Sequence, residues 1–270
     1  MYGGPRAGRR AGPNGFQLQA ATRWTLDVKG PWHDWIPGVL NRKQTKALVD
    51  QGLVTRRGAG VIPLDRSSID LSLSDEAYRM VVGAAKPVGV KPYGWFIKNE
   101  HLAEDLRPES DGSFTLQPKS TYIFKLNERL ERSLSSIEIY GQSTAKSSVG
   151  RVDVLTRLIV DGMVTYEGFD PEGLKRGSGD MYLEVTPITF KVRVRPEDSL
   201  SQLRFFYGKP SDVEIHSSVL YHAVFNDDDK NDGTLSVDLR NTEVGGLPAA
   251  AFFAESGDAG EAIPLRVTDT

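Results

Sequence analysis

One carboxylate, Glu184, stands in a stretch whose other residues are mostly apolar or prone to form strands. The stretch reads "MYLEVTP" (181–187), and strict alternation places Glu184 on one face with Tyr182 and Thr186. If that face lies in solvent, the glutamate is an ordinary surface residue, which is the commoner case. If the face lines a pocket, loss of water makes the carboxylate a better proton acceptor, and Glu184 becomes a candidate general base.

A second set of polar groups lies in "AKSSVGR" (145–151). The stretch offers an ammonium, two hydroxyls, a guanidinium and a glycine that permits close backbone approach, from Lys146, Ser147, Ser148, Arg151 and Gly150. Such groups can hold the oxygens of a triphosphate. They are equally common in a polar turn before a strand, and composition alone leaves both interpretations open.

Asp170 is a third candidate, in "YEGFDPEG" (166–173). Pro171 fixes the backbone directly after the carboxylate. A turn-forming aspartate is the usual explanation of this pattern, and a functional carboxylate is the alternative.

The composition of the chain excludes or disfavours several kinds of catalytic site, metal site and partner. The chain of 270 residues has no cysteine, so disulfides, thiolate metal sites and cysteine nucleophiles are excluded. Its four histidines form no HxxxH or HxH pair, which disfavours a zinc site, and no GxSxG elbow is present. The net charge of -3 gives no general attraction to nucleic acid or anionic membrane. No apolar run approaches about 18 residues and no signal-peptide core is visible, so we expect a cytoplasmic protein.

The elements that must position these residues are mainly strands. One short helix is expected in "VLNRKQTKALVDQGLV" (39–54), capped by Asn41 and ended by Gly52. Alternating apolar residues predict strands in 66–73, 120–126, 135–141, 180–196 (two strands, divided at Pro187) and 201–208. Several short strands without βαβ alternation indicate an all-β barrel or sandwich.

The flanks differ from this central part. Residues 1–20 are predicted to be a flexible basic tail rich in Gly, Arg and Pro, 21–210 a β-barrel domain, and 211–270 a divergent extension packing on the barrel. Within the extension, "NDDDKNDG" (226–233) favours a surface turn over a calcium loop, and 233–240 favours one more strand.

The order of the motifs resembles the dCTP deaminase family of the dUTPase-like superfamily over roughly residues 38–210. The segments that carry the resemblance are "LNRKQTKALVDQGLV", "DRSSIDLSLSDEAYRM", "AKSSVGRVDV", "GFDPEG", "GDMYLEVTP" and "FKVRVRPEDSLSQLRFFYG". The longer, tandem type of the family is the most similar. The resemblance implies a distorted β-barrel or jelly-roll-like fold, with a few short helices, in a homotrimer whose sites lie between subunits. A single copy such as this one is expected to self-associate to complete a site, to borrow a partner, or to be inactive.

The resemblance also implies a chemistry. Glu184 would activate water for attack on C4 of cytosine without zinc, giving dUTP and ammonia, and Mg²⁺ would bind through the triphosphate oxygens. The implied catalytic residues are Glu184, Ser147 and Arg151; the implied substrate-binding residues are Lys146, Ser148, Gly150, Asp170 and Gln202. The alternatives are a dUTPase-like or bifunctional pyrophosphatase that gives dUMP, in which Asp170 would activate water, and a non-catalytic nucleotide-binding or structural module.

Three features depart from the family pattern. Lys146 stands where the family has arginine, which keeps the charge but loses the bidentate fork. The turn "DPEGLKRGSGD" (170–180) is longer than in the family. The tail that closes over the triphosphate is not evident after residue 210.

Overall fold

The described part of the chain is a mostly β structure with a few short helices. The computed structural model describes residues 31–81, 83–85, 91–208, 243–244 and 247–248. Its strands are β1 (Gly38–Val39), β2 (Val54–Arg56), β3 (Ile69–Met80), β4 (Ala103–Asp105), β5 (Phe114–Leu116), β6 (Tyr122–Leu130), β7 (Ile139–Ala145), β8 (Val154–Val160), β9 (Gly168–Phe169), β10 (Asp180–Pro187), β11 (Val192–Val194), β12 (Ser199–Tyr207), β13 (Glu243–Val244) and β14 (Leu247–Pro248). Its helices are η1 (Pro31–Asp34), α1 (Arg42–Asp50), α2 (Tyr93–Asn99), η2 (Arg132–Ser136), α3 (Ser147–Arg151) and α4 (Pro171–Arg176).

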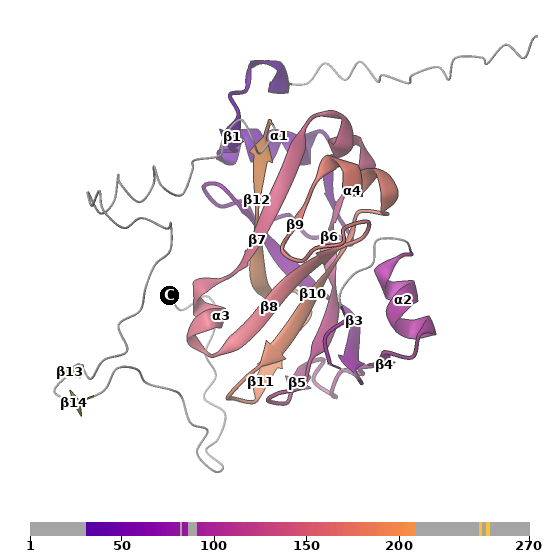
Figure 1. Cartoon of the computed structure of the whole chain (residues 1–270), viewed down its shortest axis with the longest axis vertical. Coiled ribbons are helices and arrows are strands. Elements are labelled where there is room, and N and C mark those ends of the chain that lie inside the picture. Colours follow the sequence, from indigo (N-terminus) through magenta and orange to yellow (C-terminus); the bar gives the residue numbers. More distant parts are fainter. Residues whose placement is uncertain (1–30, 82, 86–90, 209–242, 245–246, 249–270) are drawn as a thin grey trace, which may run out of the picture.

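Ten strands form one antiparallel sheet that curls into a nearly closed barrel. The main path runs β8-β10-β6-β3-β12-β7-β9, with β1, β2 and β4 added at its sides. Strands β7 and β8 are joined through α3 and lie against each other, so the two ends of the path approach one another (Figure 1). The all-β, barrel-like fold expected from the sequence is confirmed.

The inside of the barrel is the main hydrophobic core. Strand β10 sends Met181, Leu183 and Val185 inward, and its neighbour β8 contributes Leu158 and Val160, all almost fully buried. Burial of each such side chain stabilises the fold by about 1.5–3 kcal/mol. Because side chains alternate along a strand, the residues between them lie on the outer face of the sheet.

A second, smaller cluster covers part of that outer face. It is formed by side chains from β3, β6, β8 and β10 that pack under α2: Tyr78, Met80, Tyr93, Ile97, Ile123, Ile159 and Tyr182. Figure 1 shows α2 lying beside this part of the sheet. The outer face of β10 is therefore partly screened from solvent, although it does not belong to the main core.

Helix α1 forms as the sequence predicts. The side chain of Asn41 accepts hydrogen bonds from the backbone N–H groups of Lys43 and Gln44, and the Gln44 side chain accepts one from Asn41 in return, which completes a capping box. Gly52 follows the helix with φ of +67°, a conformation that glycine adopts without strain. Leu48 is fully buried and fixes the helix on the barrel.

The predicted strands are present with changed bounds; the strand predicted at 66–73 begins later and extends further, as β3. The segment 180–196 divides at Pro187 into β10 and β11, as expected. The prediction for 135–141 is wrong in its first half, because η2 continues to Ser136 and β7 begins only at Ile139. The "AKSSVGR" stretch forms a short helix rather than a turn, since Val149 is buried and anchors one helical turn.

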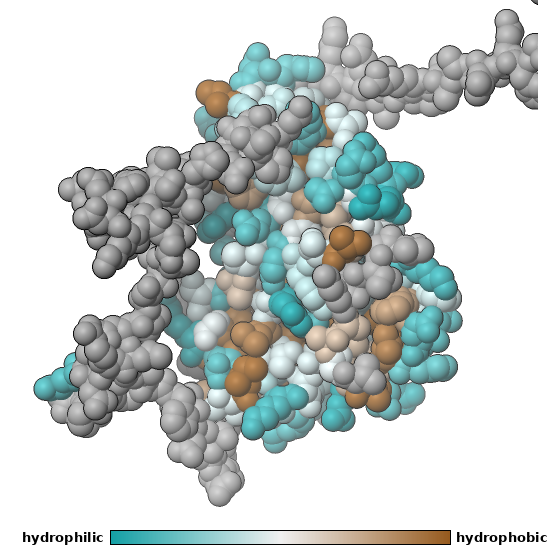
Figure 2. All heavy atoms as spheres, viewed as in Figure 1, coloured by the Kyte–Doolittle hydropathy of each residue, from teal (hydrophilic) through white to brown (hydrophobic). Residues whose placement is uncertain are grey.

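The surface in Figure 2 is mostly hydrophilic or neutral, with isolated hydrophobic side chains. Single exposed apolar residues of this kind, such as Leu155 and Phe190, are ordinary for a folded domain. No helix of the described residues is long and apolar enough to cross a membrane. The predicted tail (1–20), the acidic loop (226–233) and the strand at 233–240 lie outside the described residues, and the domain boundaries stay predictions.

Candidate active site

Glu184 lies in the middle of β10 on the outer face of the sheet, with only 4 % of its side chain exposed. The predicted alternation holds, because Tyr182 lies on the same face and packs against the ring of Tyr93 from α2 at 5.4 Å. Glu184 is thus a buried carboxylate, whereas a lone glutamate in a β-strand usually faces solvent.

The register of the sheet determines what meets this carboxylate. Glu184 is paired directly with Arg157 of β8 on one side and with Ile123 of β6 on the other. The Arg157 side chain donates two hydrogen bonds to Oε1, from Nε at 2.8 Å and from a terminal nitrogen at 2.5 Å. The hydroxyl of Tyr166 donates to Oε2 at 3.4 Å, a longer contact. The negative charge of Glu184 is therefore balanced by Arg157. Its two oxygens differ, because Oε1 accepts two short hydrogen bonds and Oε2 accepts one long hydrogen bond.

The segment between β8 and β9 completes this cluster. The guanidinium of Arg157 lies over the ring of Tyr166 at 4.2 Å from its centroid. Burial, helped by the negative charge of Glu184, raises the pKa of Tyr166 to about 12. Next to it, burial is the main cause that raises the pKa of Glu167 to about 7, with Arg157 opposing and Glu184 adding to the shift. Besides Glu184, the site therefore holds a carboxyl group, that of Glu167, whose pKa lies near neutral pH.

Helix α3 presents the second set of predicted residues. Ser147, Gly150 and Arg151 are exposed, and Ser148 is half-buried. Lys146 precedes the helix, and its ammonium donates to Asp70 of β3 at 2.8 Å. The hydroxyl and guanidinium groups of α3 are thus available at the surface, while Lys146 is already paired.

Gln202 lies close to the α3 end of β7. It is the Cα partner of Asp70 on β3 and of Thr144 on β7. Its amide accepts a hydrogen bond from Ser68 at 3.3 Å and donates one to Thr144 at 3.2 Å. Since Asp70 also binds Lys146, the structure brings Gln202 and Lys146 into one polar group beside α3.

Within one chain this polar group and Glu184 are separate. Val154, the first residue of β8, pairs with Pro187, which is three residues along β10 from Glu184. That spacing corresponds to about 10 Å, and α3 lies beyond the start of β8. Among the described residues no hydrogen bond or ion pair joins Glu184 to Ser147 or Arg151.

Asp170 lies at the start of α4. Its carboxylate accepts a hydrogen bond from the backbone N–H of Gly173 at 2.7 Å, and Pro171 occupies the first helical position. This is the geometry of a helix N-cap. The turn-forming role expected from the sequence is the one that the structure displays, with Asp170 exposed at the surface.

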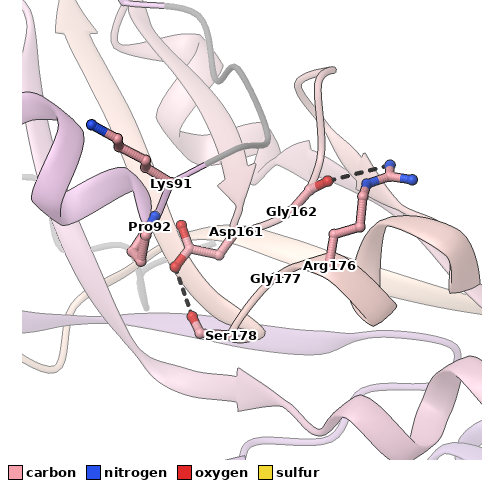
Figure 3. Close-up of a pocket in the computed structure, with 7 residues that line it drawn as sticks. All are labelled: Lys91, Pro92, Asp161, Gly162, Arg176, Gly177 and Ser178. Carbon is pink, nitrogen blue, oxygen red and sulfur yellow. Dashed lines mark hydrogen bonds between the residues drawn. The ribbon is translucent and has the colours of Figure 1, made fainter.

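A carboxylate that the sequence did not single out, Asp161, lies at the end of β8 beside a small pocket lined by Lys91, Pro92, Asp161, Gly162, Arg176, Gly177 and Ser178 (Figure 3). Asp161 is buried and accepts from the backbone N–H of Tyr93 at 2.7 Å and from the Ser178 hydroxyl at 2.6 Å. Burial raises its pKa although both hydrogen bonds act in the opposite direction. Asp161 therefore ties the start of α2 to β8, and α2 in turn covers the surroundings of Glu184.

Sequence reasoning also missed Arg157 and Tyr166. Arg157 alternates with the buried Leu158 and Thr156, so the pattern places it on the outer face of β8. Its pairing with Glu184 depends on the β8–β10 register, which no local signal specifies. No metal site accompanies these residues: in the described ranges, no group of three or more His, Cys, Asp or Glu side chains lies close enough together to hold a metal ion.

The fold and the site together define a β-barrel that carries a buried carboxylate on its outer face. The family model of the 2'-deoxycytidine 5'-triphosphate deaminase (DCD) N-terminal domain matches residues 36–209, so the chain belongs to the dCTP deaminase family. The resemblance seen in the sequence is confirmed.

A solved structure with the same fold is the crystal structure of 2'-deoxycytidine 5'-triphosphate deaminase from Agrobacterium tumefaciens. The TM-score is 0.57 at 23% sequence identity, and the match covers 78% of this chain and 59% of that one. The chain thus spans about three fifths of that structure's length. No curated protein matches the chain.

Proposed function

We propose that the chain deaminates dCTP to dUTP and ammonia, with a water activated by Glu184. The observation that carries the proposal is the buried carboxylate of Glu184 on the outer face of the barrel, with one oxygen held by Arg157 and the other only lightly engaged. Membership of the dCTP deaminase family supports the substrate class. The absence of cysteine and the scarcity of histidine in the sequence support a route without zinc.

The chemistry is a hydrolytic exchange at C4 of the cytosine ring. Glu184 takes a proton from water and passes it to N3, while the water oxygen forms a bond to C4 and the C4=N3 electron pair moves to N3. Glu184 then takes the proton of the new C4 hydroxyl and gives it to N4. The C4–N4 bond breaks, ammonia leaves and C4 becomes the carbonyl carbon of uracil, so the two protons of water end on N3 and N4.

In this proposal the other two predicted catalytic residues orient the reacting groups, and the predicted substrate-binding residues contact the rest of the nucleotide. Ser147 and Arg151 orient the water and the ring, and Lys146, Ser148, Gly150, Asp170 and Gln202 contact the sugar and phosphates. Mg²⁺ is bound by the phosphate oxygens of the substrate, where it neutralises charge. Basic and hydroxyl groups exposed on α3 support a triphosphate site at that place.

A complete site in this proposal needs more than one chain. The separation between α3 and Glu184 supports a site shared between subunits, in which α3 of one subunit meets Glu184 of another, and the resemblance to the family implies that this assembly is a homotrimer. Co-expressed Glu184→Gln and Arg151→Ala chains, each inactive alone, should then recover part of the activity in mixed trimers. Mixed oligomers as inactive as the separate variants would contradict a shared site.

Product analysis tests the function itself. The protein is incubated with dCTP, dUTP or dTTP and Mg²⁺, and the products are separated by ion-exchange chromatography. We expect dUTP and ammonia from dCTP, and no reaction of dTTP. Pyrophosphate and dUMP from dUTP would favour the dUTPase-like or bifunctional alternative, and tight nucleotide binding without turnover would favour the non-catalytic one.

A further inference from the structure

The partner of Glu184 is a residue that the proposed chemistry has not yet used. Arg157 reaches the buried carboxylate from the surface, since 43 % of its side chain is exposed against 4 % for Glu184. Both of its hydrogen bonds go to the same oxygen, Oε1. A guanidinium more often grips both oxygens of a carboxylate in a fork, so this arrangement leaves the second oxygen out of the ion pair.

That second oxygen, Oε2, accepts one hydrogen bond among the described residues. The Tyr166 hydroxyl lies 3.4 Å away, at the long end of hydrogen-bond distances. Oε2 is therefore the position at which a water molecule could donate a proton without first breaking a strong bond.

Arg157 is itself held in place. Its guanidinium stacks on the Tyr166 ring at 4.2 Å, and its backbone is fixed by the direct β8–β10 pairing with Glu184. Because its backbone and its guanidinium are both already held, the Arg157 side chain loses little conformational entropy when it orients the carboxylate. The three side chains thus form one unit in which each restricts the orientation of the next.

We propose that Arg157 is a positioning residue for the reaction: it fixes the Glu184 carboxylate through Oε1 and reserves Oε2 for the attacking water. Because removal of a positive charge next to a carboxylate generally favours its protonated form, the pH profile of activity reports whether Arg157 acts through Glu184. This inference rests on the proposed deaminase function.

Other titratable groups surround the carboxylate and must be separated from Arg157 in any test. They are Tyr166 and Glu167 between β8 and β9, and Tyr93 on α2, whereas β6 contributes the apolar Ile123. The two tyrosines have raised pKa values through burial and stay neutral near pH 7. Glu167, with a pKa of about 7, titrates in the range of interest, so the profiles are also recorded in a Glu167→Gln background.

The experiment measures dCTP deamination between pH 5 and pH 9 for the full chain, Arg157→Gln, Arg157→Lys and the control Arg42→Gln. Arg42 is an exposed residue at the start of α1, so its replacement removes one positive charge away from the site. In Arg157→Gln we expect kcat to fall about 10- to 100-fold and the acidic limb of the kcat profile to move up by about one pH unit, with KM changed less than about threefold. Arg157→Lys should restore the position of the limb and only part of kcat, because the charge remains and one hydrogen bond is lost.

Each other outcome overturns the inference in a distinct way. A lower Tm with an unchanged pH profile means that Arg157 is only structural. A higher KM at constant kcat means that it binds substrate, and a higher kcat means that it restrains the base. If the unaltered chain releases no ammonia from dCTP, the proposed function fails and the inference with it, whereas an active chain with an unshifted Arg157→Gln profile refutes the inference alone.

Discussion

Replacing Gly150 by alanine separates the binding role of α3 from its role in the fold. Gly150 lies in α3, its φ is not positive, and a Cβ atom built at this position meets no other atom within 4 Å. Alanine in a helix is about 0.5–1 kcal/mol more favourable than glycine. We therefore expect Tm to rise by about 1–4 °C for a domain of this size.

Replacing Gly177 by alanine should have the opposite effect on Tm, and it serves as the control for the effect of an added Cβ atom. A Cβ atom at Gly177 would lie 1.9 Å from the carbonyl oxygen of Asp161 and 2.6 Å from the backbone nitrogen of Gly162. These are backbone atoms that cannot turn aside, so overpacking should cost about 1–3 kcal/mol or more. Gly177→Ala is thus expected to lower Tm where Gly150→Ala raises it.

The functional part of the prediction concerns the substrate. If the nucleotide approaches the α3 backbone at Gly150, an added methyl group obstructs it at a cost of about 1–3 kcal/mol, which raises KM about 5- to 150-fold. Thermal unfolding and steady-state deamination of dCTP are measured on the same preparation of Gly150→Ala. A raised Tm together with a KM within twofold of the original would refute the placement of Gly150 in the substrate site.

Three further substitutions test the framework of the site. Glu128→Gln should lower the free energy of unfolding, measured in urea titrations, by about 3 kcal/mol. The reason is that the buried Glu128 carboxylate accepts two hydrogen bonds from Ser72 and pairs with Arg56. A loss below about 1 kcal/mol would contradict this structural role. Burial raises the pKa of Glu167 from 4.5 to about 7, so the folded chain holds this proton more tightly than the unfolded chain, and stability falls as pH rises through that interval. Glu167→Gln should therefore have a higher Tm than the unaltered chain at pH 8, with the difference vanishing toward pH 4; a constant difference would count against the burial of this group. Asn41→Ala removes the cap of α1 and should cost about 1 kcal/mol, and no change in Tm would mean that the capping box is not formed in solution.

The sequence specified the parts of the fold that depend on local pattern. Alternation in 180–196 predicted both strands and the break at Pro187, because side-chain period and proline geometry are properties of the segment itself. The capped helix at Asn41 was predictable for the same reason. The "AKSSVGR" helix was not, since serine and glycine are weak helix formers and the turn is held by burial of Val149 in the barrel.

For the site, the sequence identified Glu184 but not its environment. Alternation gave its face, whereas its burial depends on α2 and the segment around Tyr166, which are distant along the chain. The pairing with Arg157 requires the β8–β10 register, which the whole barrel determines. The cap at Asp170 could have been predicted, because an aspartate followed by proline is a frequent helix start.

The most direct test of the account is ammonia release from dCTP by Glu184→Gln. Glutamine keeps the shape of the side chain and can still accept from Arg157, but it cannot take a proton from water, so the fold should be retained while kcat falls about 10²- to 10⁴-fold. The predicted result is loss of ammonia release, with a far-ultraviolet circular dichroism spectrum like that of the unaltered chain. Turnover by Glu184→Gln at the rate of the unaltered chain would contradict the assignment of Glu184 as the base.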